Sequence, residues 1–162
     1  MATRLPLVIV NGQVQQLQTG DSISVAAAQY DNRVFTNGES SAALVAGTPV
    51  YMSAAATAKR AQANAASTAT VAGLWIDATT SASSTGNCAA GGVITCTTTQ
   101  WDAVVTGESG GLVFNSLYFL DPANVGKLTT TAPSTVGQLV CLVGRALSST
   151  DMELILAQAI LL

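Results

Sequence analysis

The stretch from Gly110 to Leu147 reads GGLVFNSLYFLDPANVGKLTTTAPSTVGQLVCLVGRAL. Its short apolar runs, such as Leu117–Leu120, are separated by glycine and proline, and few of its side chains are chemically reactive. The longer apolar run that follows Pro133 and Gly137 is expected to form a strand that ends near Ala146. Turn signals interrupt the stretch at three points, namely Gly110-Gly111, Asp121-Pro122 and Gly126-Lys127. This pattern predicts compact β structure in a protein that works through its shape.

The composition indicates one domain that hides apolar surface in contacts with other subunits. The chain has 162 residues, of which 49% are hydrophobic and only 9% are charged, whereas roughly 25% of the residues are charged in ordinary soluble domains. Its mean hydropathy is +0.43. A monomer with so few charges would expose much apolar surface to water, so we expect an oligomer or a part of a larger assembly.

Charge and run length argue against two classes of partner. The net charge is −3, and the cationic side chains are scattered apart from the Lys59-Arg60 pair, so no basic face for nucleic acid is visible. The apolar runs Leu5–Val10 and Met152–Leu162 are shorter than the roughly 20 residues of a spanning helix, and Glu153 and Gln158 interrupt the second run. We therefore expect no nucleic-acid partner, no membrane partner and no export segment.

Residues 1–25 differ in pattern from the rest and form an N-terminal arm. Leu5–Val10 is an apolar extended run, Asn11-Gly12 is a strong hairpin signal, and Gln13–Gln18 is the expected return strand. A two-stranded hairpin is too small to bury its own apolar positions. The arm must therefore dock on its own domain, on a sister subunit or on another protein. We expect five apolar residues to make this contact, namely Leu5, Leu7, Ile9, Val14 and Leu17.

The remainder is predicted to contain an irregular connection over 26–46 and a β-rich domain over 47–162. We expect strands at 50–52, 71–76, 93–97, 138–146 and 152–157, a short helical turn at 62–66, a loop at 79–87 and a turn at 100–104. Many short strands with regular turn signals favour a mainly β fold. The expected architecture is a small β-barrel or β-sandwich that carries the extended N-terminal arm.

Gly107–Gly111 reads GESGG, which resembles the sequence around the nucleophile of serine proteases. A nucleophile at Ser109 would need a base to take its proton, usually histidine, and the chain contains no histidine. A hydrolase elbow also requires a helix after the serine, whereas the following LVFNSLYFL predicts a strand. We interpret this segment as a turn.

The acidic residues suggest no catalytic or metal site. Six of them lie far apart in the sequence and mostly beside turn residues, namely Asp77, Asp102, Glu108, Asp121, Asp151 and Glu153. Turns account for them, and a paired acid and base, as in glycosidases, is the alternative. Asp121 with Asn124 lacks the spacing of a calcium loop, and no phosphate-binding loop occurs. We expect a protein that is not an enzyme and needs no cofactor.

The cysteines and the aromatic residues each have two interpretations. The three cysteines are Cys88, Cys96 and Cys141. They lack the paired spacing of a zinc site, and the chain has no histidine to complete one, so we interpret them as small buried thiols. A disulfide that joins the first two across a hairpin is the alternative. For the aromatic residues we favour positions in the core, and the alternative is that they stack on sugars or bases. The residues concerned are Trp75, Trp101, Tyr51, Tyr118 and Phe119.

Six segments follow one another in a specific order: GTPVYMS at 47–53, KRAQANAASTATVAGLWID at 59–77, GGVIT at 91–95, TGESGGL at 106–112, LYFLDPANVGKLT at 117–129 and VGQLVCLVGRALSSTDMELIL at 136–156. In this order, and with Trp101, they resemble a module of the capsid decoration (cement) and head-fibre proteins of tailed bacteriophages. The segment LPLVIVNGQVQQLQTGDSI at 5–23 is similar to the opening of phage virion proteins. The Ala- and Thr-rich segment 79–90 departs from the compact form of that module.

The resemblance implies a structural virion protein that binds the outer surface of a phage capsid and stabilises it. In that role the arm lies on the major capsid protein, and copies of the chain form a homo-oligomer, with a homotrimer favoured over a homodimer. The protein is then made in the cytoplasm of the bacterial host and located on the outer capsid surface of the virion. The alternative is a tail-fibre or head-fibre component that presents a host-binding domain with exposed loops such as 79–90.

Overall fold

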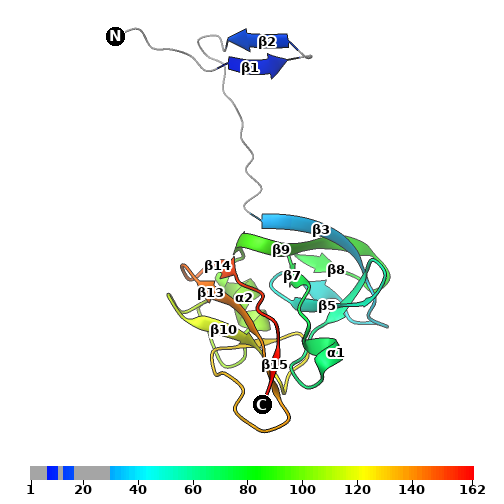
Figure 1. The fold of residues 1–162 in the computed structure, drawn as a ribbon, viewed down its shortest axis with the longest axis vertical. Coiled ribbons are helices and arrows are strands. Elements are labelled where there is room, and N and C mark those ends of the chain that lie inside the picture. Colours follow the sequence, from blue (N-terminus) through cyan, green and yellow to red (C-terminus); the bar gives the residue numbers. More distant parts are fainter. Residues whose placement is uncertain (1–6, 11–12, 17–29) are drawn as a thin grey trace.

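The computed structural model describes residues 7–10, 13–16 and 30–162, and it confirms the predicted mainly β fold (Figure 1). The largest sheet has nine strands in the order β11 (Leu128–Thr129), β10 (Leu117–Leu120), β13 (Leu142–Ala146), β14 (Asp151–Leu154), β9 (Thr85–Thr95), β3 (Tyr30–Asn37), β6 (Thr57–Arg60), β5 (Pro49–Ala54) and β7 (Gly73–Trp75). Three further pairs are β1 (Leu7–Val10) with β2 (Gln13–Gln16), β4 (Leu44–Val45) with β8 (Thr79–Thr80), and β12 (Leu139–Val140) with β15 (Ile160–Leu161). The helices are α1 (Ala66–Ala69) and α2 (Thr98–Val104).

Five strands of the large sheet close into a ring, because β7 pairs both with β5 and with β9. Around this ring β3 and β6 are parallel, and the other neighbours are antiparallel. A closed ring is the arrangement of a small barrel, one of the two architectures that the sequence predicts. Each ring strand contributes one residue to a buried cluster that also contains Leu44 of β4, namely Phe35, Val50, Ala58, Trp75 and Cys88.

Strand β9 connects the ring to the second half of the domain. Its last residues pair with β14, and its earlier residues pair with β3 and β7. Beyond β14 the sheet continues through β13 and β10 to β11, and Figure 1 shows β14, β13 and β10 on its left side. A larger core supports this half and holds Trp101 of α2 together with Tyr118, Leu120 and Met152. The domain therefore has two buried clusters, and both β9 and β7 contribute residues to each of them.

The irregular connection expected over 26–46 is wrong for Tyr30–Asn37, which form β3. The segment YDNRVFTN contains few apolar residues, so its pattern gives only a weak strand signal. It is a strand because β9 pairs with it along most of its length and because Phe35 and Asn37 are buried. The Asn37 amide donates hydrogen bonds to the carbonyl oxygens of Ala42 (3.0 Å) and Thr80 (2.9 Å), which offset the cost of burying it.

The turn predicted at 100–104 is also wrong, because Thr98–Val104 form helix α2. A capping box begins this helix. The Thr97 hydroxyl accepts a hydrogen bond from the Gln100 N–H (3.2 Å), and the Gln100 side chain accepts one from the Thr97 N–H (2.8 Å). The T-x-x-Q spacing is the sequence signal for this start, and a run of three threonines, which favour strands, masks it.

The remaining differences concern where elements begin and end. The helical turn predicted at 62–66 lies at 66–69, and the loop predicted at 79–87 contains β8 and the start of β9. The strand predicted at 138–146 divides into β12 and β13, and the one predicted at 152–157 ends at Leu154. Strands are confirmed within 50–52, 71–76 and 93–97. Neither helix of the described chain has the length and apolar character that would let it cross a membrane.

Candidate functional site

The first candidate site is the hairpin of the N-terminal arm. Strands β1 and β2 pair antiparallel, with Leu7 opposite Gln16 and Ile9 opposite Val14. The paired strands confirm the hairpin that the sequence predicts.

Three of the five residues predicted to make the contact of the arm lie at positions on one face of this ribbon. Leu7 and Ile9 occupy alternate positions of β1, and alternate positions of a strand belong to the same face. Val14 is opposite Ile9 and therefore belongs to that face as well. The other two predicted residues, Leu5 and Leu17, lie outside the described residues.

The GESGG segment follows α2 as a loop, in agreement with the predicted turn, and Asp102 anchors it. The Asp102 carboxylate accepts hydrogen bonds from the backbone N–H groups of Gly110 (3.1 Å) and Gly111 (2.8 Å). Gly111 has a φ of 88°, and a Cβ atom there would collide with the carbonyl oxygen of Ser149. Close approach to the backbone of Ser149 thus explains Gly111, and positive φ angles explain Gly107 (80°) and Gly110 (86°), without a role for Ser109.

Asp121 is buried and organises the loop after β10. Its carboxylate accepts hydrogen bonds from the Thr106 hydroxyl (2.7 Å), from the N–H groups of Ala123 (2.7 Å) and Asn124 (3.0 Å), and from the Asn124 side-chain amide (3.0 Å). Burial opposes ionisation, but these bonds outweigh it and hold the pKa of Asp121 below its ordinary value. A hollow of about 320 Å³ lies beside this turn. Because its partners are internal, we interpret the Asp121–Asn124 turn as structural.

The other candidate carboxylates also have structural partners. Glu108 accepts a hydrogen bond from the Tyr118 hydroxyl (2.7 Å), and Asp77 accepts one from the Asn87 N–H (2.8 Å). Glu153 forms an ion pair with the Arg145 guanidinium (3.0 Å). A general acid works with a raised pKa, whereas hydrogen bonds from Ser148 and Thr95 lower the pKa of Asp151. Within residues 7–10, 13–16 and 30–162, no cluster of three or more His, Cys, Asp or Glu side chains could hold a metal ion.

All three cysteines are buried and free, so the alternative of a disulfide between Cys88 and Cys96 is wrong. Burial raises the pKa of the Cys88 thiol to about 12 and that of the Cys96 thiol to about 11. Thiols with such pKa values stay protonated and unreactive at neutral pH. They serve as small apolar groups of the two cores.

The tryptophans belong to the cores, as predicted. Trp75 and Trp101 are fully buried, and the indole N–H of each donates a hydrogen bond inside the domain. Tyr118 is fully buried as well, while Tyr51 and Phe119 are partly buried. Neither indole ring is therefore available as a stacking platform for a sugar or a base.

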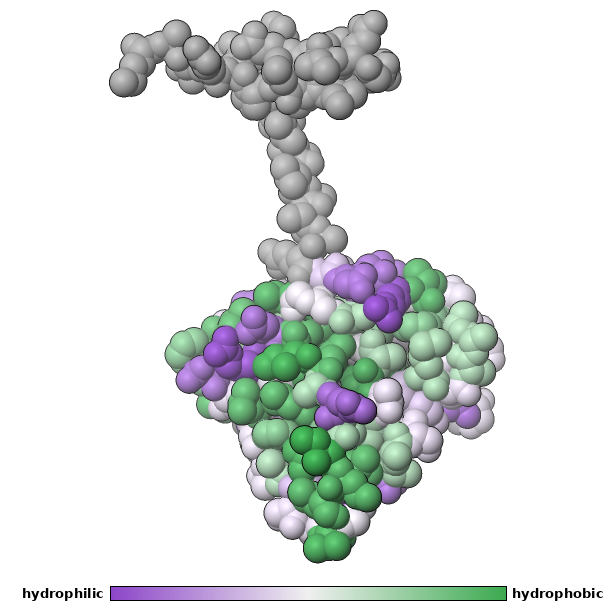
Figure 2. All heavy atoms as spheres, viewed as in Figure 1, coloured by the Kyte–Doolittle hydropathy of each residue, from purple (hydrophilic) through white to green (hydrophobic). Residues whose placement is uncertain are grey.

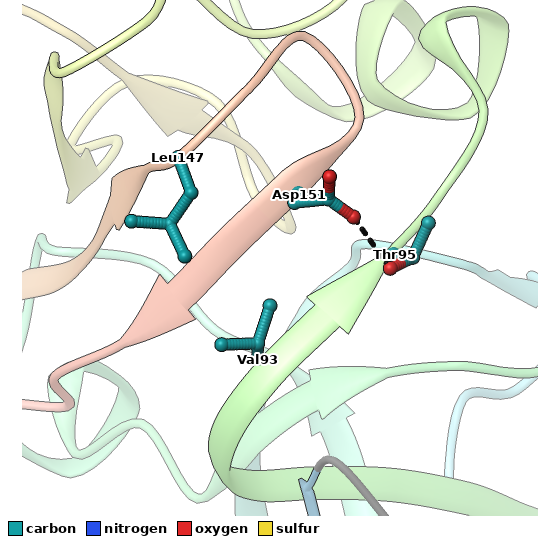
Figure 3. Close-up of a pocket in the computed structure, with 4 residues that line it drawn as sticks. All are labelled: Val93, Thr95, Leu147 and Asp151. Atoms are coloured by element: carbon teal, nitrogen blue, oxygen red, sulfur yellow. Dashed lines mark hydrogen bonds between the residues drawn. The ribbon is translucent and has the colours of Figure 1, made fainter.

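A shallow depression of about 560 Å³ lies against β9 and β14 (Figure 3). It is lined by Val93, Thr95, Leu147 and Asp151. The hydroxyl groups of Thr95 and Ser148 donate hydrogen bonds to the two carboxylate oxygens of Asp151, each at 2.6 Å. Since the charged group of the lining is already bonded and held ionised, the depression offers no free acid or nucleophile.

The most unusual surface of the domain is apolar and follows its last residues. Figure 2 shows hydrophobic surface from the middle of the domain to its lower tip, along the path of the C-terminal segment in Figure 1. We define the C-terminal apolar band as five exposed side chains, Val136, Ile155, Ile160, Leu161 and Leu162. The sequence analysis missed this band, because the lack of charged residues over 154–162 is equally typical of a buried segment.

Comparison with known proteins does not narrow the function. No family model, no curated protein and no solved structure matches the chain. The described structure therefore offers three features to interpret: a hairpin, a β domain whose reactive groups have structural partners, and an apolar band.

Proposed function

We propose that this chain is a structural protein of a tailed-bacteriophage virion, which binds the outer surface of the capsid and stabilises the shell. The observation that supports this most is the β1–β2 hairpin, a ribbon of two strands that cannot bury its own apolar positions. Such a ribbon serves to attach a domain to another protein. The resemblance of the sequence to decoration proteins suggests the major capsid protein as that partner.

The arm contacts the major capsid protein through the face that carries Leu7, Ile9 and Val14, and Leu5 and Leu17 extend this contact. A hairpin can add a strand to an exposed sheet edge, or its apolar face can enter a groove. Backbone hydrogen bonds would supply much of the affinity in the first mode, and apolar burial in the second. Both modes need one face of the ribbon more than the other.

The described domain suits the outside of a particle. Its carboxylates bind turns and neighbouring strands, and its thiols and tryptophans lie in the cores. These groups stabilise a shape, and the proposed role accordingly involves no enzyme activity and no cofactor. The net charge of −3 suits contact with solvent better than contact with packaged DNA.

Copies of the chain act together in this role, as a homotrimer in preference to a homodimer. When one arm of an oligomer is bound, the others are held near their own sites, so several weak contacts add up to firm attachment. Cyclic oligomers also match the symmetry axes of a closed shell. The protein is made in the host cytoplasm and resides on the outer capsid surface, without nucleic acid or membrane as a partner.

The second candidate function, a tail-fibre or head-fibre component, loses part of its expected ligand site. The sequence points to 79–90 as an exposed loop for a host ligand, but Thr85–Thr95 form β9, and Cys88 and Ala89 are buried. Only residues 81–84 connect β8 to β9. A host-binding role would therefore need a different surface.

The test compares two variants that alter opposite faces of the arm. One variant carries Ile9→Asn and Val14→Asn on the proposed contact face, and its matched control carries Val8→Asn and Gln15→Asn at the adjacent cross-strand pair. Binding of each full-length variant to capsids that lack the protein is measured by co-sedimentation. We expect the first variant to lose at least about 30-fold in affinity, because buried apolar anchors dominate such contacts, and the control to bind as the wild type does.

Three results would contradict the proposal. Wild-type affinity of the Ile9→Asn and Val14→Asn variant, or of a chain that lacks residues 1–25, would show that the arm is not the attachment. Equal losses in both variants would show that no face of the ribbon is preferred. Failure of the wild-type chain to bind capsids at all would remove the function itself.

A further inference from the structure

The C-terminal apolar band leaves large apolar side chains in contact with water. Val136 is 89% exposed, Ile160 66% and Leu161 68%. Scattered single apolar residues are normal on protein surfaces, but large contiguous patches mark interaction sites. The band is contiguous at its lower end, because the Gly137 N–H donates to the Leu162 carbonyl oxygen (3.1 Å) and brings Val136 near the last strand.

Strand β15 carries two of the five residues of the band, and it is open on both faces. Ile160 and Leu161 are consecutive and belong to opposite faces of β15, and because both are exposed the band extends over both sides of this strand. Among the described strands β15 pairs only with β12, with Leu139 opposite Leu161 and Val140 opposite Ile160. Two strands alone are marginally stable in water, and an unpaired apolar edge is a ready surface for another chain.

Charge restricts what can cover this surface. No charged residue occurs over 128–144 or over 154–162, the two segments that form β12, β15 and their connections. A partner that binds through charged side chains would find no opposite charge on these two segments. The matching surface must be apolar and uncharged.

We infer that the C-terminal apolar band is the surface through which copies of this chain associate with one another. A second copy brings the same uncharged apolar surface, which is the complement that the band requires. Interfaces between identical subunits are more apolar than transient interfaces, and charges are depleted at their centres. From the exposed fractions of its five residues, the band offers on the order of 500 Å² of surface, which is near the upper end of what a monomer exposes in one patch and compares with roughly 800 Å² per partner in a stable interface.

The proposed function assigns contact with the capsid to the arm, which leaves the band to a second copy of the chain. This inference rests on the proposed oligomer but not on capsid binding, so the two can fail separately.

The experiment measures the mass of the full-length chain in solution. One variant carries Ile160→Asp and Leu161→Asp in the band, and its control carries Val34→Asp on β3, where the native side chain is exposed to a similar extent (61%). Sedimentation velocity is recorded over a range of concentrations. We expect an oligomer for the wild type and for the control, and at least about 100-fold weaker association for the band variant, since unpaired charges at a dry interface are poorly tolerated.

Folding of the band variant is checked through its buried thiols, which should stay protected from a thiol reagent as in the wild type. A second measurement needs no substitution. Hydrogen exchange of the wild type should be slower over 155–162 in the oligomer than after dilution to monomer, while β3 and β9 exchange equally in both. A monomeric wild type, an oligomeric band variant, dissociation of the control to the same degree, or unchanged exchange over 155–162 would each overturn the inference.

Discussion

At the scale of single residues, Asp121 illustrates how a chain with few charges places one of them inside. Its carboxylate accepts hydrogen bonds from Thr106, Ala123 and Asn124. The substitution Asp121→Asn keeps the size of the side chain but replaces one acceptor oxygen by a donor. We expect the free energy of unfolding at neutral pH to fall by about 1–3 kcal/mol, measured by urea denaturation.

The stabilisation by Asp121 depends on pH with a definite sign. The pKa of this carboxyl is lower in the folded state than its ordinary value of 3.8, so its contribution is present above that value and is lost as the pH falls through the folded-state pKa. The difference between wild type and Asp121→Asn should therefore shrink in acid. As a control, Asp31→Asn removes an exposed ion pair with Arg33 and should change little. A difference that stays constant into acid would contradict the assigned role.

The thiols give a second prediction at this scale. Because burial raises the pKa of Cys88 to about 12 and that of Cys96 to about 11, the native protein should not react with a thiol reagent at mildly alkaline pH. In denaturant all three cysteines should react, as free thiols do. Rapid reaction of any cysteine in the native protein would show that its core opens or that its burial is assigned wrongly.

At the scale of elements, strand β9 holds the ring together. Two of its glycines allow the effect of close packing on stability to be distinguished from the effect of strand propensity. A Cβ atom at Gly86 would lie 2.5–2.7 Å from atoms of Trp75, Asp77 and Thr80, whereas one at Gly91 would meet nothing within 4 Å. We expect Gly86→Ala to destabilise the domain by about 1–3 kcal/mol through overpacking, and Gly91→Ala to be nearly neutral. Thermal unfolding of the two variants checks this. Equal effects would mean that the ring core is looser than described.

The elements also show which sequence signals are decisive. Asn11-Gly12 predicts the β1–β2 hairpin correctly, because turn chemistry is local. The segment that forms β3 has mostly polar residues, and its strand state depends on pairing with β9, which lies far away in the sequence. Helix α2 has a local signal in Thr97 and Gln100, yet strand-favouring threonines obscure it.

At the scale of the whole molecule, the mainly β class follows from the frequent turn signals, but the surfaces do not follow from the composition. The sequence shows many apolar residues without showing which of them the fold leaves in water. Burial of Trp75 and Trp101 could be predicted because large aromatic residues are scarce in this chain. Exposure of Ile160 and Leu161 could not, since it depends on β15 pairing only with β12 among the described strands.

The arm and the C-terminal apolar band divide the proposed work between two surfaces. In the proposed role the band joins copies of the chain, and the arm of each copy then attaches to the shell. Because linked arms act together, disruption of the band should also weaken capsid binding, although the arm itself is unchanged. This coupling distinguishes an assembled coat from independent subunits.

The central claim is that this chain coats the outside of a capsid, and its copy number in purified virions tests that claim most directly. Quantitative mass spectrometry would compare the amount of this chain with that of the major capsid protein in the same particles. A decoration protein should be present in many copies, at a simple whole-number ratio to the shell protein, because it occupies equivalent sites over the surface. A handful of copies per particle, as for a fibre or tail component, or none at all, would contradict the account.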